Sequence, residues 1–291
     1  MFLKNKSNQV VARAAKVGNE LHATELIDDL VLAFHRFMAN PQKLDKGCAA
    51  TTEIAAALYQ MDYLEPEIYA LGIHHVQMEG AFGPPVDAAA KLRAFSALGL
   101  GRTRHPQALE EIVWLLVDPW PQARIGAIRA LASNGGHAGA LLLRLKVLTG
   151  DAELDVLAEC FSGLLECAPG NSLPLIATYI DAEDHAVAEA ALLAIGSSRL
   201  PQALTLLRAR WEKSAFSTLR RALLLAIAMV RSEAAIEFLL SLLPDSNVQT
   251  AKEIITALAI FRDNNKVRVT VEQAVSVLNN KALGEAFRQE F

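Results

Sequence analysis

The sequence predicts an all-α protein built from a repeated two-helix unit, and three observations support this prediction. Apolar residues make up 52% of the 291 residues, and Ala and Leu dominate among them, which favours helices over strands. A small residue followed by a large aliphatic one recurs along the chain, at Ala97-Leu98, Ala130-Leu131, Gly163-Leu164, Ala194-Ile195, Ala226-Ile227 and Ala257-Leu258. The second residues of these pairs lie 33, 33, 31, 32 and 31 positions apart, and helical spacing around them is the third observation.

Positions within each repeat are numbered here from the second residue of the pair, which is position 0. Position −3 is large and apolar in every repeat, with Phe95, Ile128, Phe161, Leu192, Leu224 and Ile255. Positions −8, −4, −3, −1 and 0 together describe one face of a helix. Position −1 is always Ala or Gly, which predicts that neighbouring helices approach most closely there. A second apolar helix is expected between successive pairs, over 106–117, 137–149, 172–181, 201–213, 233–243 and 270–279.

Local signals agree with this scheme. The tetrapeptide Pro-Gln-Ala-Leu occurs at 106–109 and again at 201–204, each time at the start of an expected second helix. Leu109 and Leu204 are therefore expected at matching core positions. Aspartates at position −13 are expected to cap helices or turns, at Asp118, Asp151 and Asp245.

The N-terminal part departs from the regular period. A further repeat precedes the six, because Ala50, Ile54 and Leu58 occupy equivalent positions. The step from Leu58 to Leu98 is 40 residues, so an insertion is expected within 73–87. Residues 1–44 are expected to form a separate N-terminal part, with a polar and disordered tail over 1–18 and an amphipathic capping helix over 24–38. Residues 45–291 are expected to form the repeat domain.

Units such as DPWPQARIGAIRALASNGGHAGALLLRLKVL, residues 118–148, resemble HEAT repeats. The closest resemblance is to the short variety found in bacterial HEAT-like and phycobilisome-lyase-like proteins, and it covers roughly 45–280. It implies a right-handed α-α superhelix of about seven two-helix repeats whose second helices line the concave face. Armadillo and tetratricopeptide repeats are structural alternatives, although the Trp, Gly and Tyr pattern of the tetratricopeptide repeat is absent.

Bulk properties exclude several classes of protein. The net charge of −4 gives no general attraction to nucleic acid or anionic lipid. The N-terminus lacks the apolar core of a signal peptide, and no apolar stretch approaches the ~18 residues of a membrane span. Three cysteines, Cys48, Cys160 and Cys167, are expected to be reduced core residues. A cytoplasmic protein without a membrane partner is expected.

Motifs for catalysis and cofactor binding are missing from the sequence. It contains no P-loop, no dinucleotide-binding glycine pattern, no GxSxG, no HExxH and no CxxC. His75 and Glu79 would share a face if their stretch were helical, but two ligands without a third make a weak metal site. The lyase-like resemblance leaves a lyase-type accessory enzyme as an alternative, although function does not follow from a shared repeat. A non-enzymatic protein without cofactor or metal is expected.

Charges are distributed in two blocks. From Asp151 to Ser198 the chain has nine acidic residues and no Lys or Arg, whereas from Arg199 to Arg231 it has seven basic residues and one acid, Glu212. The acidic block would repel phosphates, which argues against the nucleic-acid-binding alternative known among HEAT-like proteins. The blocks predict either salt bridges between repeats or a bipolar docking surface, through which the chain could also self-associate.

The tryptophans suggest where a partner would bind. Trp114 is expected to point outward with Glu110 and Glu111, opposite the apolar side of its helix, and to lie on the concave face. Trp120 occupies a position that is polar in most repeats, so it is either a plug between repeats or an exposed anchor. Trp211 is expected in the core.

The sequence therefore predicts a scaffold or adaptor that binds a protein or peptide of unknown identity. Trp114 and Trp120 are its expected anchors, and the acidic block sets the partner's orientation together with basic residues of the second block, Arg208, Arg210, Arg220 and Arg221. The insertion around His75 and Glu79 is a second candidate contact.

Overall fold

A computed structural model describes residues 2–80, 83–103, 105–214 and 218–291. Helices dominate these residues, which confirms the all-α prediction. The strands among them, β1 (Met78–Glu79) and β2 (Val86–Asp87), form a short antiparallel pair with Met78 opposite Asp87. Within the same residues, no helix is both long enough and apolar enough to cross a membrane.

Contacts divide the chain into two compact units, Met1–Cys167 and Ala168–Phe291. The first unit contains α1 (Asn8–Glu20), α2 (Ile27–Met38), α3 (Pro41–Leu44), α4 (Ala49–Gln60), α5 (Pro66–Ile73), α6 (Ala90–Arg102), α7 (Ala108–Trp114), α8 (Pro121–Asn134), α9 (Gly136–Thr149) and α10 (Leu154–Cys167). The second contains α11 (Pro169–Ala177), α12 (His185–Ser198), α13 (Ala203–Ser214), α14 (Arg220–Met229), α15 (Glu233–Ser241), α16 (Val248–Leu258), α17 (Asn265–Val277) and α18 (Lys281–Glu290). Short 3₁₀ turns join them at Phe2–Lys4 (η1), Thr24–Leu26 (η2), Lys46–Cys48 (η3), Leu115–Val117 (η4), Thr178–Asp181 (η5) and Ala259–Phe261 (η6).

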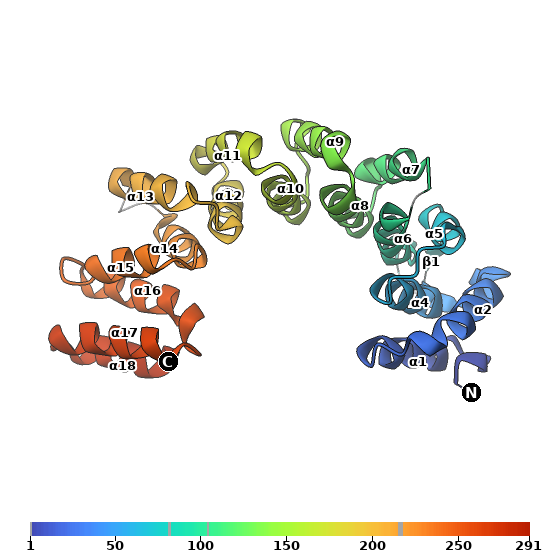
Figure 1. Cartoon of the computed structure of the whole chain (residues 1–291), viewed down its shortest axis with the longest axis horizontal. Coiled ribbons are helices and arrows are strands. Elements are labelled where there is room, and N and C mark those ends of the chain that lie inside the picture. Colours follow the sequence, from blue (N-terminus) through green and yellow to red (C-terminus); the bar gives the residue numbers. More distant parts are fainter. Residues whose placement is uncertain (1, 81–82, 104, 215–217) are drawn as a thin grey trace. The chain divides into compact units, whose positions relative to one another are not determined.

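Helices carrying the small-large pairs form a row within each unit. In the first unit α4, α6, α8 and α10 pack in succession, with α1 against α4 at the start, while α5, α7 and α9 form a second row. Within this unit the first row lies on the inner side of the bend and the second row on the outer side (Figure 1). In the second unit α12, α14, α16 and α18 likewise pack in succession.

Core positions follow the expected face. Position −1 is buried in all six repeats, and position 0 is buried in all except α6, where Leu98 is half-buried. The Pro-Gln-Ala-Leu copies start equivalent helices, since α7 begins at Ala108 and α13 at Ala203. The expectation for their leucines was off by one residue, because Ala108 and Ala203 are the buried ones, whereas both leucines are half-buried.

Small residues allow the helices of the first row to approach closely. A Cβ added at Gly126 of α8 would lie 2.4 Å from the Cα of Ala94 on α6, and one at Gly196 of α12 would lie 2.2 Å from the carbonyl oxygen of Ala226 on α14. The close backbone approach at Gly126 is at position −5 of its repeat. Close packing of this row places it on the inner side of the bend.

The N-terminus differs from its expectation. Residues 1–18 are not a disordered tail, because α1 buries Val11, Ala12, Ala15 and Gly18 and packs against α4. These small apolar residues alternate with polar ones, so the average composition conceals a helical face. The amphipathic helix expected over 24–38 is present as α2, which buries Leu30, Phe34 and Phe37. The N-terminal part thus extends the first row by one helix.

Two buried arginines join successive repeats in the first unit. Arg93 of α6 donates from Nη1 to Asp87 Oδ2 at 2.6 Å and from Nε to Asp118 Oδ2 at 2.8 Å. Arg124 of α8 donates to the Asp118 carbonyl at 2.7 Å and to Asp151 Oδ1 at 2.8 Å. Each arginine thereby connects the turn before its own helix to the turn before the next one.

The turn aspartates predicted at position −13 have a double role. Asp118 accepts a hydrogen bond from the Trp120 N–H at 2.8 Å, and Asp151 accepts one from the Glu153 N–H at 2.9 Å, in addition to their arginine contacts. In the last repeat the cap is Asn247 rather than Asp245, since its side chain accepts from the Thr250 N–H at 2.9 Å. The arginines themselves were missed, although Asp followed six residues later by Arg occurs twice, at 87/93 and 118/124.

The network also determines how the aspartates titrate. Burial acts to raise the pKa of the Asp87 carboxyl, but hydrogen bonds from the Gln77 and Ala89 N–H groups and from Arg93 lower this pKa below its ordinary value overall. Burial also acts to raise the pKa of Asp151, but hydrogen bonds from Lys146, the Glu153 N–H and Arg124 outweigh this effect and lower the pKa below its ordinary value. Both carboxylates therefore stabilise the fold in their charged form.

We expect Gly126→Ala to lower the free energy of unfolding by about 1–3 kcal/mol, because the new methyl group would overlap the α6 backbone. Chemical denaturation at pH 7 measures this. The matched control is Gly170→Ala in α11, where an added Cβ meets nothing within 4 Å. That variant should be unchanged or up to about 1 kcal/mol more stable, since Ala favours helix. Equal losses in both variants would contradict the packing argument.

We expect Asp87→Asn to destabilise the protein by about 2–4 kcal/mol at pH 7, because Arg93 loses a buried partner. The folded-state pKa of Asp87 is lowered. Its contribution is therefore complete above the unfolded-state value of about 3.9 and is lost as pH falls through the folded-state value. The gap between wild type and variant in urea denaturation midpoints should narrow from pH 5 to pH 3. A gap that stays constant would reject this linkage, and the exposed Asp155→Asn serves as control.

Candidate functional site

A polar groove of about 610 Å³ lies in the second unit, along α14 and α16. We call it the unit-2 groove. Its lining residues are Glu189, Thr218, Arg221, Ala222, Leu225, Gln249, Lys252, Glu253, Thr256 and Ala257. Glu189 comes from α12, Thr218 from the turn before α14, and the others from α14 and α16. The groove thus spans three consecutive helices of the row.

Helical spacing explains why these residues meet. In α14 and the residues before it, the lining residues 218, 221, 222 and 225 occupy positions −9, −6, −5 and −2 of their repeat. In α16, residues 249, 252, 253 and 256 occupy the same four positions. Positions −8, −4, −3 and 0 face the core. Positions −9, −6, −5 and −2 therefore lie on the side of each helix that faces away from the core. Two equivalent polar faces on neighbouring helices therefore form the walls.

Position −6 is the most informative one. It holds Glu189, Arg221 and Lys252 in the three repeats that line the groove, but apolar residues in α6, α8 and α10. This change from apolar to charged residues at one repeat position is a sequence signal that could have located the groove. The sequence analysis named Arg220 and Arg221 but missed Lys252, Gln249 and Glu253.

One acid in the groove is neutralised by a neighbour. Arg220 donates to Glu253 from Nε at 2.6 Å and from Nη2 at 3.0 Å, and Gln249 Nε2 donates to the same carboxylate at 3.0 Å. The hydrogen bonds from Arg220 are the main reason why the pKa of Glu253 lies below its ordinary value, and the charge of Arg221 contributes. Glu253 therefore stays ionised and paired.

Two cations remain available in the groove. Arg221 is exposed and Lys252 is half-buried, and within the described residues the side chain of neither makes an ion pair or a hydrogen bond. Thr218 Oγ1 and Thr256 Oγ1 lie at the edges, the first 3.3 Å from His185 Nδ1 and the second donating to Glu290 Oε1 at 2.9 Å. Two cations without partners can bind carboxylates.

Chemistry of other kinds has little support in the part of the chain that the structure describes. There, no group of three or more His, Cys, Asp or Glu side chains is placed to hold a metal ion. Cys48 and Cys160 are buried and unpaired as expected, and burial raises the pKa of each thiol to about 12. Cys167 is half-buried rather than fully in the core. The two buried thiols are therefore protonated and inert at neutral pH.

Trp114 lies at the end of α7, and 71% of its side chain is exposed. Its outward orientation was predicted, but α7 belongs to the outer row of the first unit, not to the inner side of the bend (Figure 1). Glu110 beside it is exposed, whereas Glu111 Oε2 lies 2.8 Å from Nε2 of His74. Val117, 73% exposed, follows on η4. Trp114 is thus a surface residue on the side opposite to the expected one.

The other tryptophans have different environments. Trp120 is half-buried and precedes α8, with its N–H bound to Asp118. Trp211 is 8% exposed, as expected for a core residue.

Several residues of the basic block form contacts inside the second unit. The Arg208 guanidinium lies 4.5 Å from the centre of the Phe238 ring, and Arg210 Nη2 lies 2.9 Å from Asp181 Oδ1. The Arg210–Asp181 and Arg220–Glu253 pairs support the interpretation that opposite charges form salt bridges between repeats, whereas Arg208 makes a cation–π contact. Arg221 is the residue of the predicted set that stands apart from such pairing.

The condition under which His75 and Glu79 would share a helical face is not met. This stretch contains β1 instead of a helix, so the two side chains do not share a helical face. Glu79 Oε1 accepts from the Gly47 N–H at 2.8 Å and also from Gln77, while His75 Nε2 lies 3.1 Å from Gln77 Oε1. Glu79 holds the insertion against the loop before α4, and His75 contacts Gln77 within the insertion.

No protein-family model matches the chain, and no curated protein matches it. The resemblance to HEAT repeats therefore depends on the repeat positions alone.

We expect Trp114→Ala to change the free energy of unfolding by less than about 0.5 kcal/mol, because its ring is largely in solvent. Trp211→Ala should cost about 3–5 kcal/mol, because it leaves a cavity in the core. Urea denaturation of the two variants measures the difference. A loss for Trp114→Ala as large as that for Trp211→Ala would show that Trp114 is a packing residue instead of a surface one.

Proposed function

We propose that this protein is a non-enzymatic scaffold or adaptor of HEAT-like repeats that binds an acidic segment of a partner protein in the unit-2 groove. The observation that carries the proposal is the pair of cations Arg221 and Lys252, which face one groove without partners in the described residues. Lys252 is half-buried and so loses solvation without gaining a contact, and an incoming carboxylate would improve its environment and could also pair with the exposed Arg221.

We further propose that within each unit the repeats stack as a right-handed superhelix. Equivalent positions face the core in α8, α10, α12, α14 and α16. In both units, buried Ala or Gly at position −1 lies on the helices that pack in succession. In this arrangement the helices that carry the small-large pairs form the concave face, instead of the second helices of the repeats. Close contacts at Gly and Ala bring these helices nearer together, so their row is the shorter side of the curve. The unit-2 groove then belongs to the concave face.

A protein segment fits the groove better than nucleic acid does. Glu189 and Glu253 line it together with the two cations, and the whole chain carries a net charge of −4. A regular polyphosphate chain would meet these carboxylates, whereas a peptide can place its acidic and basic side chains individually. The lyase alternative has less support, because Glu253 is held by Arg220 and Gln249.

Trp114 is proposed as a second contact on the first unit. An exposed Trp next to an exposed Val has the character of an interaction anchor.

We expect a fluorescein-labelled decapeptide of glutamates to bind the wild-type chain at low salt, and a decapeptide of lysines to bind more weakly. Arg221→Glu combined with Lys252→Glu should weaken binding of the acidic peptide by about tenfold or more, because two attractive contacts become repulsive. Fluorescence anisotropy measures both affinities, and a single-stranded oligonucleotide of equal charge serves as the third probe.

The matched control is Arg268→Glu combined with Lys281→Glu, which makes the same change in net charge on α17 and α18 of the same unit. It should bind the acidic peptide like wild type. If the oligonucleotide binds and the acidic peptide does not, the nucleic-acid alternative replaces this proposal. If both double variants weaken binding equally, the effect is one of net charge and the groove is not the site.

A further inference from the structure

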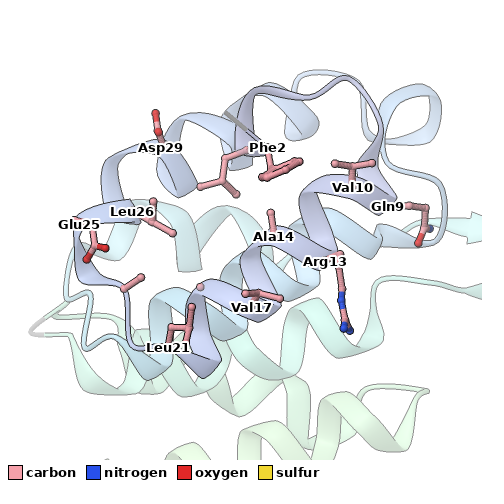
Figure 2. A pocket seen from close by; sticks show the side chains of 13 residues that line it. Phe2, Gln9, Val10, Arg13, Ala14, Val17, Leu21, Glu25, Leu26 and Asp29 are labelled. Carbon is pink, nitrogen blue, oxygen red and sulfur yellow. The ribbon is translucent and has the colours of Figure 1, made fainter.

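An apolar groove of about 710 Å³ lies in the first unit, beside α1. We call it the α1 groove. Along α1 it is lined by Val10, Ala14, Val17 and Leu21, and Phe2 and Leu26 lie across from them (Figure 2). Leu21 is 73% exposed, Phe2 71% and Val17 37%. An open groove with such large apolar side chains is unusual on a protein surface.

The spacing of these residues identifies what shape would cover them. Val10, Ala14, Val17 and Leu21 follow one another at intervals of 4, 3 and 4 residues, the pattern of a helix that packs along another helix. A different face of α1, with Val11, Ala15 and Gly18, is already buried toward the chain's own interior. A helix with two apolar faces needs a neighbour on each, yet α1 stands at the end of its row, with α4 as its row neighbour.

The charges beside the stripe favour a second copy of α1 over other helices. With Ala14 and Leu21 as heptad positions a, the flanking g positions are Arg13 and Glu20. Both side chains are exposed, and within the described residues neither makes an ion pair or a hydrogen bond. The other edge, Val11 and Gly18, is buried. One edge therefore carries two opposite charges seven residues apart.

Such an edge is complementary to itself when a second copy runs antiparallel. A two-fold axis between residues 15 and 16 places Val10 opposite Leu21 of the second copy and Ala14 opposite Val17 of the second copy. Antiparallel helices bring g positions together, so Arg13 of each copy comes close to Glu20 of the other, and two salt bridges form. In a parallel pair each g position would instead meet the buried apolar edge, and both charges would lack partners.

We propose that the α1 groove is the interface of a homodimer, in which α1 of a second copy lies antiparallel along Val10, Ala14, Val17 and Leu21. The dimer covers the apolar side chains that one copy leaves in solvent and pairs the two charges at its edge. It also doubles the number of partner-binding surfaces, which raises avidity for a multivalent partner.

The test is the oligomeric state of the full-length chain by sedimentation equilibrium. Wild type should be dimeric at micromolar concentration. Arg13→Glu and Glu20→Arg should each weaken the dimer by about tenfold or more, because two attractive contacts become repulsive. The double variant R13E/E20R should recover the wild-type dimer, since its two charges are merely exchanged.

Mixing the two single variants gives a second readout. An R13E chain has two acids at its edge and an E20R chain has two bases, so the mixture should form a heterodimer that neither variant forms with itself. Lys16→Glu is the matched control, because Lys16 is exposed on α1 but lies outside the stripe and its edge. It should leave the dimer unchanged.

All three substituted residues, Arg13, Lys16 and Glu20, are exposed, so circular dichroism should show the same helix content in every variant. A wild-type chain that stays monomeric would overturn the proposal. A dimer that the single charge reversals leave intact, or that the double variant fails to recover, would show that the copies associate through another face and would also overturn it.

Discussion

The arrangement of the first unit depends on two buried guanidinium groups. Arg93 and Arg124 lie between consecutive repeats, where removal from water makes an unpaired charge very costly. Each one donates hydrogen bonds to acceptors on two successive turns, so the turns cannot shift relative to each other without breaking charged hydrogen bonds. Apolar packing alone is non-directional, whereas these contacts define one register between neighbouring helix pairs.

The same repeat position has acquired a different use in the second unit. Arg124 and Arg220 both stand at position −7 of their repeats, and both reach forward to an acid of the next repeat. Arg124 binds the turn residue Asp151 and is nearly buried, but Arg220 binds Glu253 on the face of α16 and is half-buried. The link between helices has thus moved toward the surface, where it forms one wall of the unit-2 groove and leaves Arg221 free to meet a ligand.

The apolar side of the architecture explains the other surface feature. Each helix inside a row is covered by the helix before it and the helix after it, so its small residues are buried from both sides. The first helix of a row has no predecessor, and α1 nevertheless retains a second apolar stripe. A stripe of this kind stabilises nothing in an isolated chain, which is why a helix from a second copy is a natural complement.

The sequence by itself determined the helical class, the repeat length, the core positions and the burial of Trp211, because these follow from short-range periodicity and apolar character. It also indicated the exposure of Trp114 and part of the groove, through Arg221. Only the tertiary structure decided which row lies on the inner side of the first unit, which acids Arg93 and Arg124 bind, and that Met78–Glu79 pairs with Val86–Asp87. These outcomes depend on contacts between residues that are tens of positions apart, such as Gly126 against Ala94, and a local pattern carries no information about how closely two distant helices can approach.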